Sequence, residues 1–228
     1  MIEQLQKIKV FKYCKTELLD KIAENIILKE EAPGTTILNH GDESKSVYII
    51  FEGSVMIIQL TEEGKVVGLE LAKSGGCFGE MSAIDGSRRS ASVVSLGNVR
   101  LGILNHAFFK NYVLKDYDFC RGLLAKFARV VRRSNQQVFS LSTASAKKRL
   151  LLQVVRLSSI NKLDPSIMAL EEGLSHTTIG SFAGISRETV TRLIGDLKSD
   201  KIIWTNKSGH LEMNIEKVYK ELSSLLSL

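Results

Sequence analysis

Residues 175–200 read SHTTIGSFAGISRETVTRLIGDLKSD, which is the pattern of two helices separated by a tight turn. The apolar face of the first helix comprises Thr178, Ile179, Phe182 and Ala183, and that of the second comprises Val190, Leu193, Ile194 and Leu197. Between them lies the turn Gly184-Ile185-Ser186, in which Ser186 is a good N-cap for the second helix. We therefore predict a helix-turn-helix over these residues.

The opposite face of the second helix is polar and carries Glu188, Thr191, Arg192 and Gly195, with Arg187 on its flank. An arginine can donate two parallel hydrogen bonds to guanine O6 and N7, and a glutamate can accept one from cytosine N4. We expect this helix to enter a major groove of double-stranded DNA, with Arg187, Glu188 and Arg192 as base readers. Further candidate DNA contacts are Ser186, Thr189 and Thr191. An exposed ion pair between Glu188 and Arg192 is the structural alternative, and both roles are compatible.

A hairpin with a basic tip is predicted after the helix-turn-helix. Its strands are Ile202-Ile203-Trp204 and Leu211-Glu212-Met213, and its tip is Lys207-Ser208-Gly209-His210. A helix-turn-helix followed by such a hairpin predicts a winged helix-turn-helix. Candidate phosphate contacts are Lys201, Lys207 and the cluster Lys147-Lys148-Arg149, which would add affinity without sequence information. Solvation of each lysine is the alternative.

The charge of the chain is unevenly distributed. The formal net charge is +6, and residues 119–163 contain ten Lys or Arg and no Asp or Glu. A one-signed run of this kind is either a solvated helix face or a surface for a polyanion. The neighbouring helix-turn-helix favours DNA as the partner.

A long helix is expected from Cys120 to Leu141. Phe127, Val131, Ser134, Val138 and Leu141 are separated by 4, 3, 4 and 3 residues, which is the coiled-coil period. A symmetric homodimer seam explains this stripe, and packing of the helix on its own barrel is the alternative. Ser134 is either a small residue tolerated in packing or a hydroxyl aimed at a ligand. The serine-rich residues 140–145 predict a hinge before a second helix that begins near Ala146.

The first half of the chain has the pattern of a β-protein, in which turn residues separate short strands. Eleven of the 17 glycines lie between Gly34 and Gly102, where they separate short apolar runs such as Val47-Tyr48-Ile49-Ile50-Phe51. Strands of this length and spacing predict a sandwich or barrel from about Thr35 to Leu104. A short helix with Leu18, Leu19 and Ile22 on one face precedes it.

A second cluster of functional residues lies within this barrel. It reads Phe78-Gly79-Glu80-Met81-Ser82-Ala83, followed by Arg88-Arg89-Ser90-Ala91. A glycine lets a ligand approach the backbone, a glutamate can accept from a ribose hydroxyl, and an arginine beside a serine can bind phosphate. A surface turn held by a salt bridge is the structural alternative. We refer to residues 78–91 as the cassette.

Both clusters resemble the CRP/FNR family of bacterial transcription regulators. Ser186-Arg187-Glu188-Thr189-Val190-Thr191-Arg192 is similar to the recognition helix of the family, and the cassette is similar to a phosphate-binding cassette of cyclic nucleotide-binding domains. The resemblance implies an α+β fold with an N-terminal jelly-roll β-roll at 1–116, a dimerisation helix and hinge at 117–144 and a winged helix-turn-helix at 145–228. It also implies a homodimer that recognises a TGTGA-like palindromic operator, with RNA polymerase as a further partner.

The resemblance assigns the ligand residues as well. They are Gly79, Glu80, Met81, Ser82, Arg89, Ser90 and Ala91 in the cassette, together with Ser134 and Asn135 on the long helix. Arg88 has no counterpart and is expected to be solvated. Family members have Thr then Ser where this chain has Ser134 and Asn135. Cyclic AMP is the leading allosteric effector and cyclic GMP its rival; the alternative is a regulator that needs no nucleotide or senses another effector.

Other functional classes fit less well. Cys14, Cys77 and Cys120 are widely separated and form neither a disulfide framework nor a metal-binding pair, and no basic residue adjoins Cys77 in sequence. A haem sensor would need axial ligands such as Cys77 or His40 in a supporting motif. The four histidines form no catalytic pattern, so neither an enzyme nor a metal is expected. With no signal peptide or membrane span in the sequence, we expect a cytoplasmic protein.

Overall fold

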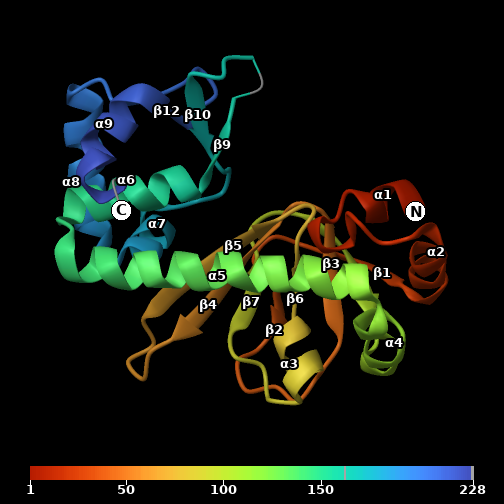
Figure 1. Cartoon of the computed structure of the whole chain (residues 1–228). Coiled ribbons are helices and arrows are strands. Elements are labelled where there is room, and N and C mark those ends of the chain that lie inside the picture. Colours follow the sequence, from red (N-terminus) through yellow and green to blue (C-terminus); the bar gives the residue numbers. More distant parts are fainter. Residues whose placement is uncertain (162, 227–228) are drawn as a thin grey trace. The chain divides into compact units, whose positions relative to one another are not determined.

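The computed structural model describes residues 1–161 and 163–226, in two compact units. The first is Met1–Arg133 and the second is Ser134–Leu228. Figure 1 shows the order of the elements along the chain, from the red N-terminal helices to the blue C-terminal helix. The expected fold class, a β-roll followed by a long helix and a winged helix-turn-helix, is confirmed.

The first unit is a roll of two four-stranded antiparallel sheets. One sheet has the order β1-β8-β3-β6 and the other has the order β2-β7-β4-β5. The strands are β1 (Ile27–Glu31), β2 (Thr36–Leu38), β3 (Val47–Glu52), β4 (Ser54–Leu60), β5 (Val66–Lys73), β6 (Cys77–Phe78), β7 (Ser92–Ser95) and β8 (Val99–Leu104). Apolar side chains from both sheets are buried between them, including Ile50, Val55 and Leu101. This packing holds the cassette, which connects β6 of one sheet to β7 of the other.

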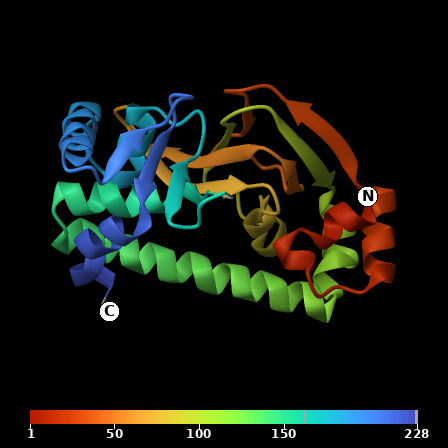
Figure 2. The same cartoon turned by 90° about the horizontal axis from the view of Figure 1, so that it is seen from above.

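Helices cover one end of the roll. They are α1 (Ile2–Gln6), η1 (Lys9–Phe11), α2 (Thr16–Asn25), α4 (His106–Asn111), η2 (Val113–Lys115) and the start of α5 (Tyr117–Thr143). Figure 2 shows the N-terminal helices beside α4 and α5. Among them, the ring of Phe119 contacts the rings of both Phe11 and Phe109. The predicted face of Leu18, Leu19 and Ile22 is buried in this cluster.

The sequence interpretation missed strand β1. Its residues Ile27-Leu28-Lys29-Glu30-Glu31 pair with β8, but four of the five are exposed. The strand therefore has no alternation of buried and exposed residues, which is the signal by which strands are recognised in sequence. Its main-chain hydrogen bonds to β8 hold it in the sheet.

The second unit contains helices and a small sheet. The helices after α5 are α6 (Ala146–Arg156), α7 (His176–Ala183), α8 (Arg187–Ser199) and α9 (Ile215–Leu226). The strands are β9 (Ser158–Ile160), β10 (Ile167–Leu170), β11 (Ile203–Thr205) and β12 (Leu211–Asn214), in the order β11-β12-β10-β9. The helix that was expected near Ala146 begins at that residue. Lys162, a member of the predicted basic run, lies outside the described residues.

Most of the serine-rich segment expected to form a hinge is helical. Helix α5 continues to Thr143, and only Ala144 and Ser145 separate it from α6. The hydroxyls of Ser142 and Thr143 donate to the carbonyls of Val138 and Phe139, four residues earlier, so they compete little with the helix. The interruption is therefore two residues long, with Ser145 capping α6.

Candidate functional site

The cassette begins with a tight passage at Gly79, between β6 and α3 (Glu80–Asp85). Gly79 has a φ of +81°, a conformation that other L-residues adopt only with strain. A Cβ atom there would lie 2.7 Å from Nη1 of Arg89 and 2.9 Å from the carbonyl oxygen of Ser46. Glycine at this position allows the backbone and the arginine to approach each other.

Arg89 is 3% exposed and is bound by protein acceptors on three sides. Its Nη1 donates to the carbonyl of Gly79 and its Nη2 to the carbonyl of Ser46, each at 2.7 Å, while Nε donates to Oγ of Ser44 at 3.1 Å. Burial lowers the pKa of Arg89, against the opposing effects of Tyr48, Asp42 and Glu80. A guanidinium has five N–H groups, so two remain for an anion after these contacts.

Glu80 is 5% exposed and forms an ion pair with Lys126 of helix α5. Its Oε1 lies 2.8 Å from Nζ of Lys126. The other oxygen, Oε2, is buried and has no hydrogen-bond partner among the described residues. A buried carboxylate oxygen without a donor costs free energy, so this atom is an acceptor available to a ligand.

Lys126 also contacts Cys77, the residue immediately before the cassette. Its Nζ donates to the carbonyl of Cys77 at 2.6 Å and lies 3.7 Å from Cys77 Sγ. Burial lowers the pKa of Lys126, but Cys77 and Glu80 together hold that pKa above its usual value. The expectation that no basic group adjoins Cys77 is wrong, because the fold brings Lys126 into contact with it. Burial nevertheless outweighs Lys126 and raises the pKa of the Cys77 thiol to about 11, so the thiol stays protonated at neutral pH.

The other cassette residues differ in exposure. Ser82 is buried and its hydroxyl donates to the carbonyl of Arg88, whereas Met81 is 51% exposed. Ala91 is buried, and Ser90 is exposed with its carbonyl accepting from Gln59. These four residues are the sequence neighbours of Glu80 and Arg89, and none of them is charged.

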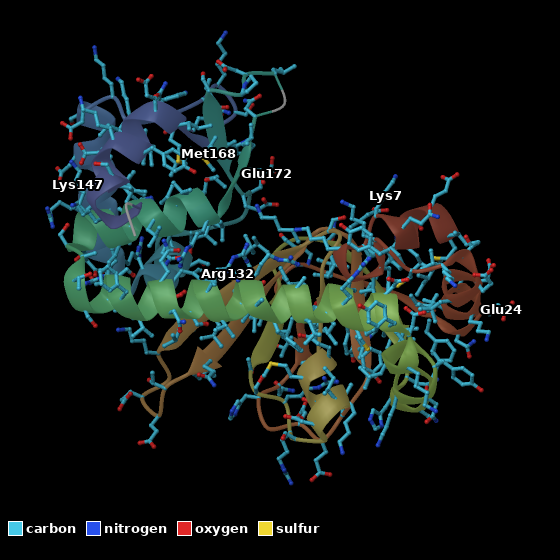
Figure 3. All side chains as sticks on the ribbon, in the orientation of Figure 1. Lys7, Glu24, Arg132, Lys147, Met168 and Glu172 are labelled. Carbon is cyan, nitrogen blue, oxygen red and sulfur yellow. The ribbon has the colours of Figure 1, made fainter. Side chains whose placement is uncertain are left out.

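Arg88 and the long-helix residues are exposed. Arg88, expected to be solvated, forms an exposed ion pair with Glu43. Ser134 and Asn135 are exposed on α5 and are the first two residues of the second unit. Arg132 precedes them on the same helix (Figure 3).

In the second unit, a close turn joins α7 to α8. The backbone N–H of Ile185 donates to the carbonyl of Gly180, and a Cβ atom on Gly180 would lie 2.6 Å from the carbonyl oxygen of Ile185. Ser175 and Ser186 cap the two helices with their hydroxyls. The predicted apolar face of α8 is buried: Val190, Leu193, Ile194 and Leu197. The sequence therefore folds into the expected helix-turn-helix.

The polar face of α8 is open to solvent. Arg187, Glu188, Thr191, Arg192 and Gly195 are all exposed. Arg192 pairs with Asp196 at 3.4 Å instead of with Glu188, and an exposed pair of this kind contributes at most about 0.5 kcal/mol. The guanidinium of Arg192 can therefore leave Asp196 for another partner at little cost in free energy.

Glu188 and Thr191, on the same face, also have local hydrogen-bond partners. Hydrogen bonds to its own backbone N–H and to Ser186 lower the pKa of Glu188, so it is ionised at neutral pH. The hydroxyl of Thr191 donates to the carbonyl of Arg187 and contacts Nδ1 of His176 at 2.8 Å. Since that hydroxyl has one proton, His176 is the donor in the second contact. Burial, Lys198 and Arg187 lower the pKa of His176.

The predicted wing is present as the hairpin of β11 and β12. Ile203 pairs with Met213, and Lys207 is exposed at the tip. The basic cluster Lys147-Lys148-Arg149, in the first turn of α6, makes contacts within the protein. Lys147, labelled in Figure 3, pairs with Asp200 and Glu221, and Arg149 donates to the carbonyls of Ala183 and Ala144. These contacts favour a structural role for Lys147 and Arg149 over the expected phosphate contacts.

The sequence interpretation missed three residues that complete the cassette. Lys126 compensates Glu80, while Ser44 and Ser46 hold Arg89. All three lie more than 30 residues from the charged group that they contact, and none belongs to a recognisable motif. Only the lack of acidic residues near Lys126 in sequence indicated that its partner was elsewhere.

Comparisons with known proteins assign both units to known domains. A family model described as cyclic nucleotide-binding domain matches residues 28–116, and one described as Crp-like helix-turn-helix domain matches residues 149–218. The cAMP-activated global transcriptional regulator CRP of Haemophilus influenzae is 26% identical over 191 residues, which cover 82% of this chain and 84% of the relative. The cassette and the helix-turn-helix lie within the matched ranges.

Solved structures support the fold. FixK2 from Bradyrhizobium japonicum has a TM-score of 0.73 at 18% identity, covering 86% of this chain and 96% of that one. The c-di-GMP responsive global regulator CLP from Xanthomonas campestris has a TM-score of 0.72 at 16% identity, covering 88% and 99%.

A cyclic nucleotide-binding domain followed by a Crp-like helix-turn-helix defines a transcription regulator, not an enzyme. The chain belongs to the CRP/FNR family of transcription regulators. Among the described residues, no helix is both long and apolar enough to cross a membrane, and no three metal-ligating side chains gather in one place.

The contacts of Arg89 predict that it stabilises the roll even without ligand. Arg89→Leu leaves the Gly79 and Ser46 carbonyls without donors, and we expect a loss of about 3 kcal/mol in the free energy of unfolding. Arg88→Leu, the matched control, removes an exposed ion pair with Glu43 and an exposed hydrogen bond to the Gly41 carbonyl, and should cost less than about 1 kcal/mol. Native-state hydrogen exchange of amides in β3 and β8 measures the first unit alone. Equal stability of the two variants would contradict this role.

Proposed function

We propose that this protein is a homodimeric regulator that binds a cyclic nucleotide in the cassette and a palindromic operator with the two α8 helices. The observation that carries the proposal is that the cassette contains two buried side chains, one a hydrogen-bond donor and the other an acceptor, each with bonding capacity left for a ligand. Arg89 has N–H groups left for a phosphate, and Glu80 has a buried oxygen left for a hydroxyl. A cyclic nucleotide has one anionic phosphate beside a ribose 2′-hydroxyl.

The residues present fit such a ligand. Gly79 admits it to the backbone, Arg89 and Ser90 would hold the phosphate, and Glu80 would accept from the ribose. The remaining cassette residues, Met81, Ser82 and Ala91, would shape the site. Ser134 and Asn135 would meet the base from the long helix.

Cyclic AMP is the effector we favour, with cyclic GMP as its rival. The Haemophilus influenzae relative is described as cAMP-activated. Asn135 is an amide that both donates and accepts, so it suits the edge of either purine. Ligand binding can shift the dimer only through different affinities for two of its conformations.

A second candidate function is a regulator that needs no nucleotide or responds to another effector. One observation favours it: Arg89 is already held by three protein acceptors. A guanidinium satisfied in this way does not depend on a ligand for its place in the fold. The relative from Xanthomonas campestris is described as c-di-GMP responsive, so effectors differ among proteins of this fold.

Titration calorimetry with cyclic AMP and cyclic GMP in parallel tests the effector. We expect one of them to bind the full-length protein, and gel shifts with a TGTGA-containing palindromic duplex to show tighter DNA binding in its presence. Because the coupling is reciprocal, the duplex should tighten nucleotide binding by the same factor. DNA binding that is equally tight with and without both nucleotides, together with no heat of binding, would instead favour the second candidate.

The DNA interface we propose consists of α8 and the wing. Arg187, Glu188 and Arg192 would read bases, and Ser186, Thr189, Thr191 and Lys207 would contact the DNA around them. The solvent exposure of the polar face of α8 supports this assignment. In a dimer, the two recognition helices would lie about 34–36 Å apart to enter successive major grooves.

Arg192 and Lys207 should differ in how they affect binding. Arg192→Ala should cost about 1–3 kcal/mol on the cognate operator and relax the preference at one base pair, because its bidentate donor is lost. Lys207→Ala should weaken binding to all sequences alike and reduce the salt dependence by about one ion. Competition gel shifts with single-base operator variants separate the two. A uniform loss in Arg192→Ala would exclude base reading.

The dimer would form along α5. Of the predicted seam, Val131, Ser134, Val138 and Leu141 are exposed, whereas Phe127 is partly buried against the core of the first unit. Leu124, which was not in the predicted seam, lies seven residues before Val131, and Leu124, Val131 and Val138 are 68%, 57% and 65% exposed. Large apolar side chains at this spacing favour a partner helix of the same sequence. The boundaries we propose remain 1–116 for the roll, 117–144 for the dimer helix and hinge and 145–228 for the DNA-binding domain. RNA polymerase and a cytoplasmic location complete the proposal.

Substitution of a single seam residue tests the dimer. Leu124→Glu places two like charges in the seam of a symmetric dimer, and we expect the dissociation constant to rise at least about tenfold. Arg129→Glu, on an exposed face of the same helix, is the control and should remain dimeric. Sedimentation velocity over a concentration series gives both constants. A dimer unaffected by Leu124→Glu would place the interface elsewhere.

A further inference from the structure

The ion pair between Glu80 and Lys126 is more buried than the usual surface pair. The side chains of Glu80 and Lys126 are 6% and 16% exposed, and the two residues come from α3 and α5, which are 46 positions apart in sequence. A buried carboxylate is tolerated when a cation compensates it and its remaining oxygen finds a donor. Here the first condition is met by Lys126, and the second is unmet because Oε2 has no partner among the described residues.

The ammonium group of Lys126 has no N–H to spare for a ligand. It has three N–H groups, and three acceptors surround it: Glu80 Oε1, the Cys77 carbonyl and, more weakly, Cys77 Sγ. Lys126 therefore acts on a ligand through Glu80. It fixes one oxygen of the carboxylate and leaves the other, Oε2, buried without a donor among the described residues.

The charge supplied by Lys126 determines what Glu80 can accept. Hydrogen bonds to an ionised carboxylate are roughly twice as strong as those to a neutral group. A carboxylate buried at this site needs a compensating cation, and Lys126 supplies it at 2.8 Å. The ion pair thus compensates the buried carboxylate and leaves Oε2 as an acceptor without a donor among the described residues.

We propose that Lys126 is a specificity-determining positioning residue, which makes the cassette select effectors carrying a hydroxyl beside the anionic group over those that lack it. The proposal rests on the binding of a cyclic nucleotide at this site. For such a ligand, the hydroxyl is the ribose 2′-hydroxyl, and the discriminated analogue is the 2′-deoxy nucleotide. Lys126 acts through the buried carboxylate and requires no contact of its own with the ligand.

The experiment measures the ratio of the dissociation constants for 2′-deoxy-cyclic AMP and cyclic AMP by titration calorimetry on the full-length protein. In the unsubstituted protein we expect a ratio of at least about ten, because a hydrogen bond to a charged acceptor is lost. Lys126→Met and Lys126→Gln should reduce this ratio at least about fivefold. Lys126→Arg, which keeps the charge, should retain it, as should the control Arg129→Met on the same helix.

A purely structural role for Lys126 would weaken both ligands equally and leave the ratio unchanged. Lys126→Gln can still donate to the Cys77 carbonyl, so it provides a neutral variant if Lys126→Met does not fold. If the unsubstituted protein binds both nucleotides equally, or if both neutral variants keep its ratio, the proposal is overturned while nucleotide binding stands. If neither nucleotide binds the unsubstituted protein but the duplex does, the proposed effector is wrong, and the inference fails with it.

Discussion

Three charged side chains of the first unit are largely removed from water, and the partners that they need determine how the cassette is built. Arg89 and Glu80 are buried and the side chain of Lys126 is only 16% exposed, so each needs partners that replace water. Arg89 has three from the protein, and Lys126 has Glu80 and Cys77. Glu80 is left with one unsatisfied oxygen. Folding thus leaves a buried acceptor near a buried cation, a combination that favours a small anionic ligand with a hydroxyl.

The second unit follows a different principle, because its functional groups lie at the surface. The apolar side of α8 is buried and its N-terminus is capped by Ser186, so the polar side is held outward by packing alone. The weak pairing of Arg192 with Asp196 leaves its guanidinium free to exchange partners. A rigid helix with loosely held polar groups suits a protein that must distinguish one base sequence from another.

Local patterns predicted much of this structure. The helix-turn-helix, the wing and the long helix follow from helical spacing and turn residues, and the glycine-rich barrel follows from short apolar runs. Strand β1 was missed since its residues are exposed on both faces, and residues 140–143 were expected in a hinge although their hydroxyls bond within the helix. Lys126 was missed for another reason: nothing in a linear sequence states which lysine will be buried against which glutamate. Likewise, the basic cluster in the first turn of α6 gave no sign that Arg149 would donate to carbonyls of its own unit.

We propose that the buried charges of the cassette form the effector site. Hydrogen–deuterium exchange of the full-length protein, with and without saturating cyclic AMP, tests it most directly. We expect slower exchange over residues 78–91 when the nucleotide is present, because its phosphate and hydroxyl would bind Arg89 and Glu80 at the same time. Unchanged exchange over these residues, or protection confined to another part of the chain, would contradict it.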